Sequence, residues 1–270
     1  MDAGIDVGTL RISPVFDGSA TVPPRSMLSR PGPDGDEWAA HRQFLTADGK
    51  LELTIGGFLV QGGGRTVLID AGVGRVDDGT FKGGALLDSL AALGVAPGDV
   101  TDVVLTHLHF DHVGWTTSQG KIVFEAATYR CHEADWAHFV AAPDAAPGAV
   151  RKLSPLADRL EPWSGEGSVL AGIDVRPAPG HTPGSTVVVV SSGEDRALLL
   201  GDVVHCPVEL LEDDWRMVYD VDPLLAARTR EALAREFEGT DVPLAAAHFP
   251  GMRFGRLLAG EGRRLWQFDA

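Results

Sequence analysis

Cysteine is scarce in this chain, since Cys131 and Cys206 are the only two in 270 residues. A disulfide framework is therefore excluded, and a reducing compartment is expected. The amino-terminal residues 1–6 lack both the basic segment and the apolar core of a signal peptide. We therefore expect a cytoplasmic protein in which Cys206 is a packing residue.

Basic residues are also few, and long hydrophobic runs are absent. The 23 Lys and Arg residues stand against 38 Asp and Glu residues, so the formal net charge of -15 disfavours a nucleic-acid partner. The longest apolar stretches, such as 187–190 and 197–200, have the length of strands and fall far short of a membrane span. The 44% hydrophobic content still suffices for a packed core, which indicates a globular protein with no membrane partner.

Two successive β-rich series follow residue 50, and helical patterns accompany both. Strands are predicted at 51–60, 66–69, 102–105, 122–124 and 128–131, then at 173–178, 185–190, 197–200 and 242–247, with a closing hairpin at 256–268. Helices are predicted at 86–93, 133–140 and 223–237. No linker of flexible composition separates the two series. This order favours an α+β fold in which two similar halves form a helix-covered two-sheet sandwich, as one domain over residues 1–270.

Residues 1–50 are less regular and are predicted to form an N-terminal extension of that domain. A strand is expected at 10–15, but the prolines between residues 23 and 33 interrupt any later element. Long irregular segments in compact domains are often lids or binding loops. We expect this extension to act as a lid or a dimer contact, with plain surface connection as the alternative. A second irregular stretch, 141–149, is predicted to be a surface excursion.

The densest group of polar side chains directly follows the predicted strand 102–105. It contains His107, His109, Asp111 and His112 within six residues. Alternation along an extended chain places His107 and His109 on one side, and a turn can bring Asp111 and His112 to the same cavity. Burying such groups without partners costs several kcal/mol, and converging imidazoles and carboxylates are the ligands that Zn²⁺ requires.

Three further polar residues occur where a predicted strand ends. His181 lies in the sequence Pro-Gly-His-Thr-Pro-Gly, Asp202 follows the strand 197–200, and His248 follows the strand 242–247. Together with the first motif they provide enough imidazoles and carboxylates for two ions that share one carboxylate.

In this order the motifs resemble those of the metallo-β-lactamase superfamily, from about residue 50 to the C-terminus. The resemblance implies a four-layer αββα sandwich. The ligand sets it implies are His107, His109 and His181 for the first ion, Asp111, His112 and His248 for the second, and Asp202 for both. Asp70 matches an early structural aspartate of the family, and we expect it to orient a ligand rather than to bind metal.

The function implied by the resemblance is that of a binuclear metal-dependent hydrolase. The segments around Asp202, 215–222 and His248 look most like the branch of methyl parathion hydrolase and quorum-quenching lactonases. That branch implies a homodimer, in which a metal-bridging hydroxide attacks an ester, a lactone or a phosphotriester of a small uncharged molecule. Zn²⁺ is the expected metal, with Mn²⁺, Co²⁺ and Fe²⁺ left open. Asp111 and His205 are the candidate acids for the leaving group.

Several points stay open from the sequence. His205 stands where related acyl-homoserine lactonases carry a tyrosine. The aromatic residues expected over the metals are Phe110, Trp115, Trp136 and Phe249. The alternatives are a glyoxalase II-like thioesterase, a mononuclear iron dioxygenase of the persulfide type and a non-catalytic binding protein. The thioesterase alternative stays open because the C-terminal region contains basic residues that could bind glutathione: Arg253, Arg256, Arg263 and Arg264.

Overall fold

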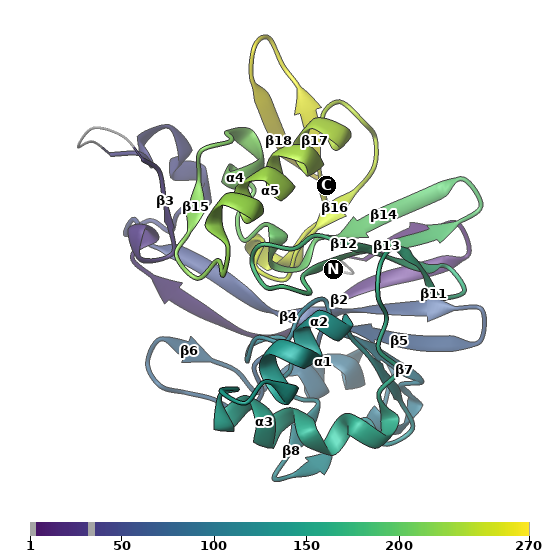
Figure 1. The fold of residues 1–270 in the computed structure, drawn as a ribbon. Coiled ribbons are helices and arrows are strands. Elements are labelled where there is room, and N and C mark those ends of the chain that lie inside the picture. Colours follow the sequence, from purple (N-terminus) through teal and green to yellow (C-terminus); the bar gives the residue numbers. More distant parts are fainter. Residues whose placement is uncertain (1–3, 32–35, 270) are drawn as a thin grey trace.

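Two seven-stranded sheets stack face to face in the computed structural model, which describes residues 4–31 and 36–269 (Figure 1). The first sheet has the order β1 (Ile5–Val7), β2 (Leu10–Val22), β4 (Leu51–Gly62), β5 (Arg65–Ile69), β7 (Asp102–Val104) and β10 (Thr128–Arg130), and β6 (Phe81–Lys82) pairs with β2. The second has the order β11 (Gly167–Leu170), β12 (Ile173–Pro177), β13 (Thr186–Ser192), β14 (Asp195–Leu199), β16 (Leu244–Ala245), β17 (Gly255–Ala259) and β18 (Arg264–Phe268). Within these sheets the pairs β5–β7, β7–β10 and β14–β16 are parallel.

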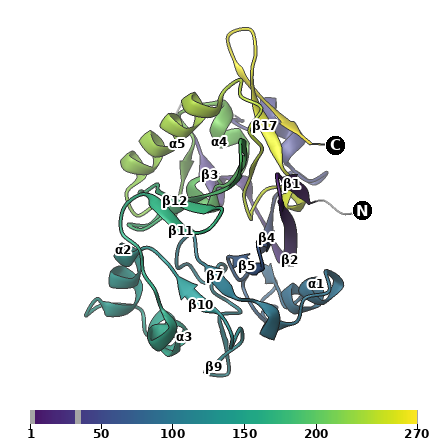
Figure 2. The same ribbon diagram turned by 90° about the vertical axis from the view of Figure 1, so that its right-hand side faces the viewer.

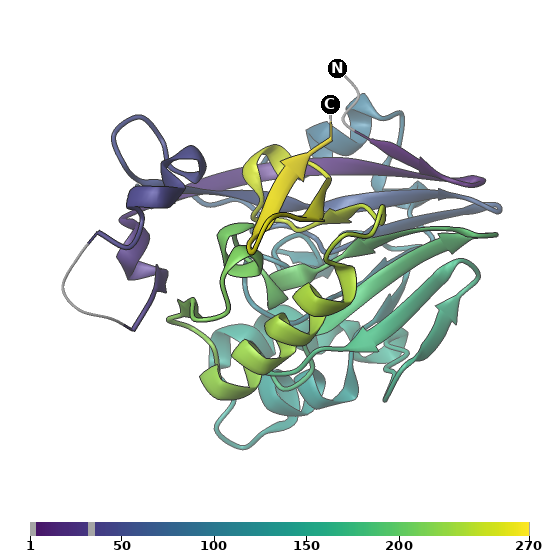
Figure 3. The ribbon, with the colours of Figure 1, turned by 90° about the horizontal axis from the view of Figure 1, so that it is seen from above.

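Helices cover the outer faces of both sheets. The helices are α1 (Leu86–Ala92), α2 (Glu133–Trp136), α3 (Pro147–Leu153), α4 (Val208–Leu211) and α5 (Pro223–Phe237). A π-helical turn, Ala137–Ala141, continues α2, and short 3-10 turns lie at Pro24–Ser26, Ala39–Phe44, Pro97–Asp99, Ser154–Arg159, Gly201–Val203 and Pro250–Met252. Two small ribbons complete the fold: β3 (Leu28–Ser29) with β15 (Arg216–Met217), and β8 (Thr117–Ser118) with β9 (Lys121–Ile122). Figures 1 and 2 show α4 and α5 on one side of the strands and α1 to α3 on the other, and Figure 3, seen from above, shows α5 in front of the strands.

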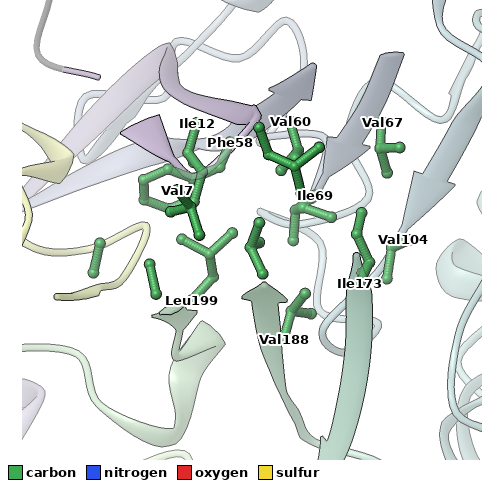
Figure 4. Packing of buried hydrophobic residues seen from close by; sticks show 14 of the residues in the cluster. Val7, Ile12, Phe58, Val60, Val67, Ile69, Val104, Ile173, Val188 and Leu199 are labelled. Atoms are coloured by element: carbon green, nitrogen blue, oxygen red, sulfur yellow. The ribbon is translucent and has the colours of Figure 1, made fainter. Parts of the chain in front are cut away.

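Alternating side chains of the strands build three apolar layers. Val60 and Ile69 of the first sheet point toward Val188 and Leu199 of the second, in the core between the sheets (Figure 4). Their neighbours in sequence point outward instead, since one residue along a strand reverses the direction of the side chain. Leu59 and Leu68 thus pack with α1, and Leu198 and Leu244 pack with α5. The four-layer αββα sandwich is therefore confirmed.

The second half of the chain follows its sequence signals closely. Helix α5 begins at Pro223 and ends at Phe237, as predicted, and the Asp222 side chain caps it by accepting from the Leu225 N–H at 3.0 Å. The closing hairpin also forms. The surface excursion differs, because Pro147 starts α3 inside the stretch 141–149.

The N-terminal residues contribute more regular structure than expected. Strand β2 extends to Val22, well beyond the predicted end at residue 15, and a register shift between Phe16 and Gly18 bends it. Residues 5–22 thus belong to the first sheet. The next residues pack in an apolar cluster that joins Leu28 and Trp38 to Trp215 and Met217. A lid or dimer role for residues 1–50 stays a prediction.

Among the residues with a described placement, no helix has the length and apolar character needed to cross a bilayer.

Candidate metal centre

The predicted ligands gather at one edge of the sandwich, in loops that follow strands of both sheets. The first motif follows β7 of the first sheet, whereas His181, Asp202 and His248 follow β12, β14 and β16 of the second. These seven residues form two groups whose ligand atoms lie within 4.8 Å of one another inside each group. The groups are His107, His109, His181 and Asp202, and Asp111, His112 and His248.

In the first group, three imidazoles converge around one carboxylate. His109 Nδ1 lies 3.1 Å from His107 Nε2 and 2.9 Å from His181 Nε2. Asp202 Oδ2 lies 3.6 Å from His107 Nε2 and 3.5 Å from His181 Nε2. Burial lowers the pKa of His107 well below its ordinary value and that of His109 to about 4. Both imidazoles are therefore neutral at neutral pH, which is the form that binds a metal.

The second group meets the same carboxylate from the other side. His112 Nε2 lies 3.0 Å from Asp202 Oδ1, and His248 Nε2 lies 3.3 Å from Asp202 Oδ2. The third member, Asp111, places Oδ2 at 3.5 Å from His248 Nε2. Asp202 is therefore within reach of both groups, which is the position a shared ligand requires.

Buried polar atoms without hydrogen bonds show that these residues suit a cation. His112 Nε2 and Asp202 Oδ1 are buried, and neither makes a hydrogen bond of acceptable geometry. Such orphaned atoms are rare in folded proteins unless an ion or water satisfies them. Although burial lowers the pKa of His112, the carboxylates of Asp202 and Asp70 raise it well above its ordinary value. The concentrated negative charge and the nitrogen–oxygen donor set fit a divalent metal.

Two of the predicted ligands that direct Nε2 toward Asp202 have their Nδ1 hydrogen-bonded on the opposite side of the ring. His112 Nδ1 donates to Asp70 Oδ2 at 2.8 Å, and His248 Nδ1 donates to the Thr54 carbonyl oxygen at 2.8 Å. Asp70 also accepts from the N–H and the hydroxyl of Thr106, both at 2.8 Å, so it orients the start of the first motif too. It keeps a φ of 61°, a costly backbone conformation for a residue other than glycine. Such outer contacts fix the tautomer and the ring orientation of a metal ligand.

Asp135 of α2 is an anchor that the sequence analysis missed. Its fully buried carboxylate accepts from the Leu108 N–H at 3.0 Å, between two of the histidines. It also accepts from the Thr182 hydroxyl at 3.0 Å and the Gly184 N–H at 2.6 Å, just beyond His181. Asp135 therefore ties the loop of the first motif to the loop of His181.

His205 lies in the same buried region. Its Nε2 is 3.3 Å from Asp202 Oδ2, and its ring stacks on that of His248 with a centroid distance of 5.7 Å. Burial opposes protonation, but the Asp202 carboxylate outweighs it and raises the pKa of His205 to about 10. The neighbouring Cys206 is buried in the apolar cluster of Trp215, and burial raises the pKa of its thiol. Cys206 thus has the surroundings of a packing residue.

A cavity of about 390 Å³ opens above the two groups. His109, Asp111, His181, Asp202, His205 and His248 contribute to its lining, and its other residues are Val22, Ser26, Met27, Leu53, Thr80, Phe81, Phe110, Met217 and Tyr219. This wall is mostly apolar, and none of the described residues that line it is a lysine or an arginine. The segment around Met27 belongs to residues 1–50, so part of the predicted extension borders the cavity.

The expected aromatic lining was right only for Phe110. Trp115 is buried under the first sheet, where its Nε1 donates to Asp17 Oδ1 at 2.8 Å, and Trp136 packs in the same outer layer. Phe249 is buried against Trp266, with ring centroids 5.2 Å apart. These three predictions were wrong because neighbours in sequence point into different layers.

Two aromatic residues that the sequence did not single out, Phe81 and Tyr219, contribute to the cavity wall. Phe81 is far in sequence from the histidine motifs, and Tyr219 lies in the segment 215–222, in which no aromatic residue had been assigned to the cavity. Phe81 makes an edge contact with Phe110, with ring centroids 5.1 Å apart. The aromatic wall is therefore assembled by the fold.

The αββα sandwich and its clustered histidines and aspartates define a class of metal-binding proteins. The sequence model described as the Metallo-beta-lactamase superfamily matches residues 57–248, more than half of the chain. The chain belongs to the metallo-beta-lactamase superfamily.

Curated relatives share this domain. Metallo-beta-lactamase domain-containing protein 1 of Mus musculus is 32% identical over 179 residues, which cover 64% of this chain and 60% of the relative. The protein of the same name from Homo sapiens is 31% identical over 203 residues, which cover 72% of this chain and 61% of the relative. The chain thus spans about three fifths of the length of these relatives.

Solved structures share the fold over nearly the whole chain. AidC, a dizinc quorum-quenching lactonase in complex with a product, has a TM-score of 0.84 at 24% identity and covers 99% of this chain and 97% of its own. The hydrolase AbOPH has a TM-score of 0.83 at 25% identity and covers 98% of this chain and 95% of its own. An AiiA mutant from B. thuringiensis with bound N-decanoyl-L-homoserine has a TM-score of 0.67 at 18% identity, over 92% of this chain and 95% of its own.

Proposed function

We propose that this protein is a binuclear metal-dependent hydrolase of a small uncharged ester, lactone or phosphotriester. The observation that carries the proposal is the position of Asp202, which contacts both groups of predicted ligands at the floor of an apolar cavity. A dizinc lactonase and a hydrolase are among the proteins of the same fold, and they support this choice.

Each group would hold one ion, and Asp202 would contact both. The first ion would be held by His107, His109 and His181, and the second by Asp111, His112 and His248. Divalent ions in such sites lower the pKa of a coordinated water and polarise an electrophilic oxygen. Nitrogen and oxygen donors of this kind suit Zn²⁺, which we propose as the metal.

The cavity supports an uncharged substrate. Its apolar wall can bury the nonpolar part of a ligand, while the polar floor orients the reacting group. The arginines that would favour a thioester of glutathione lie on the C-terminal hairpin or, in the case of Arg253, just before it. Arg256 pairs there with Asp269, and Arg264 pairs with Glu238 and Asp213. None of the four arginines lines the cavity among the described residues, which argues for a lactone, an ester or a phosphotriester.

Metal analysis combined with a hydrolysis panel tests the function. We expect about two zinc ions per chain and turnover of at least one of a γ-lactone, a homoserine lactone, p-nitrophenyl acetate and methyl paraoxon. A glutathione thioester completes the panel, and preference for it would favour the thioesterase alternative. A single iron without hydrolysis of any compound would overturn the proposal. Light scattering during gel filtration tests the homodimer that the family resemblance implies.

His205 and Asp111 are the residues we propose for protonating the leaving group, since both line the cavity beside Asp202. We expect His205→Ala to lower kcat about a hundredfold, in the range typical of lost acid catalysis, while both ions stay bound. Kinetics and metal content of the variant check this, and His205→Gln serves as a variant of similar volume. Normal kinetics in both variants would reduce His205 to a part of the cavity wall.

A further inference from the structure

The face of α5 that packs toward the second sheet contains a buried arginine. Arg230 is only 3% exposed, and the residues buried with it on this helix include Ala226, Leu233 and Phe237. Removing a guanidinium group from water costs several kcal/mol unless partners compensate for it. If α5 only had to cover the sheet, an apolar residue would be more favourable at position 230. The reason for a buried arginine must therefore lie in the groups that it contacts.

The first partner is Asp220, which contacts one of the predicted metal ligands. Both Nη1 and Nη2 of Arg230 lie 3.2 Å from Asp220 Oδ2. The other carboxylate oxygen, Oδ1, accepts from His181 Nδ1 at 3.0 Å. Asp220 therefore uses one oxygen for the arginine and the other for the histidine, so Arg230 sets the angle from which Asp220 approaches His181.

The second partner is Glu209, which holds the main chain at His205. Arg230 Nε lies 3.5 Å from Glu209 Oε1. Glu209 Oε2 accepts from the backbone N–H groups of His205 at 2.6 Å and of Cys206 at 3.1 Å. One guanidinium group thus contacts two buried carboxylates, and each carboxylate holds a different part of the metal centre.

We propose that Arg230 is a positioning residue. Through Asp220 it fixes the position of the His181 ring, and through Glu209 it fixes the main chain at His205. This inference rests on the proposed function, because it assigns His181 a metal to bind. The planar guanidinium has donors on three nitrogens and can meet both carboxylates at once, whereas an ammonium group is a single compact charge. Arg230 also donates to the Trp215 carbonyl oxygen at 3.3 Å, which ties the chain leading to Asp220 to the same point.

The variant Arg230→Lys tests this role, with Arg130→Lys as the matched control. Arg130 is also buried and pairs with the buried Asp102, but these residues lie on β10 and β7, and neither side chain contacts a predicted ligand. We expect Arg230→Lys to weaken binding of one Zn²⁺ about tenfold, as measured by competition with a chromophoric chelator. We also expect kcat to fall while KM is unchanged, since the cavity wall stays intact. The control should lose thermal stability without either change.

Equal zinc affinity and equal kcat in the two variants would overturn the inference and leave the proposed function standing. Wild-type protein that binds no zinc and hydrolyses nothing in the panel would overturn both. Asp220→Asn provides a second test in case the lysine variant does not fold. Asparagine replaces one carboxylate oxygen by an NH2 donor, so a donor would face either Arg230 or His181 where an acceptor now stands, and the same loss of zinc affinity is expected. Wild-type zinc affinity in Asp220→Asn would also overturn the inference.

Discussion

Replacing Asp202 by asparagine is expected to lower kcat/KM by more than about a hundredfold and to release at least one of the two ions. This loss exceeds the 10–100-fold effect that is usual for residues that only support a ligand, because Asp202 contacts both groups directly. Asparagine keeps the volume of the side chain but removes the negative charge that two cations would share. Metal content and steady-state kinetics of the purified variant check this expectation.

The matched control for this experiment is Asp195→Asn, at an exposed position where β14 begins. It removes the same charge at the start of β14, whereas Asp202 follows the end of that strand, and it does not touch the metal centre. Its metal content and kinetics should therefore equal those of the wild type. Two bound ions and full activity in Asp202→Asn would contradict the binuclear proposal, because a shared ligand cannot be lost without consequence.

The second large effect is expected on stability, from Asp17→Asn. Asp17 is 1% exposed, and its carboxylate accepts hydrogen bonds from three segments of the chain. The donors are the N–H groups of Val73, Gly74, Gly84 and Leu86 and the indole Nε1 of Trp115. Asparagine replaces one acceptor oxygen by a donor, so at least two buried donors lose their acceptor. At about 1–3 kcal/mol for each, the free energy of unfolding should fall by roughly 2–6 kcal/mol.

Urea unfolding followed by tryptophan fluorescence measures this change, with Asp158→Asn at an exposed position as the control. The control should unfold at the wild-type urea concentration. A fall comparable to the total stability of a typical domain would leave part of the protein unfolded at 37 °C. An unchanged midpoint in Asp17→Asn would show that the three segments are held by their apolar packing alone.

The sequence predicted the strands and helices whose signals are local. Helix α5 has a capping aspartate, a proline in its first turn and an apolar face, so both of its ends were predicted correctly. Strand β2 was predicted too short, because polar and apolar side chains alternate only weakly over residues 16–22. These residues are extended because they pair with β4, which the local sequence does not reveal. Helix α3 was missed because a run rich in alanine, proline and glycine carries no periodic signal.

The predicted ligands came together because each directly follows a strand, and strand ends of a packed sandwich meet at one edge. The residues that hold them were not predictable in this way. Asp135 and Arg230 are single charged residues in segments without a motif, and Asp220 had no role assigned to it within the segment 215–222. Only the folded chain shows that Asp135 and Asp220 hold the loops of the predicted ligands and that Arg230 contacts Asp220. The prediction of the aromatic residues in the cavity wall failed for the same reason, since Trp115 is close to the first motif in sequence but points into another layer.

The metal centre draws its proposed ligands from both halves of the sandwich, and neither half supplies a complete set. His107 and His109 come from the first sheet, but the ion they would hold also needs His181 from the second. Asp111 and His112 depend on His248 in the same way. A change in how the two sheets pack would therefore move the ligands of one sheet away from those of the other, and metal binding would weaken before the fold is lost. Substitutions among the apolar residues between the sheets are then compatible with metal binding only if they preserve the distance between the two sheets.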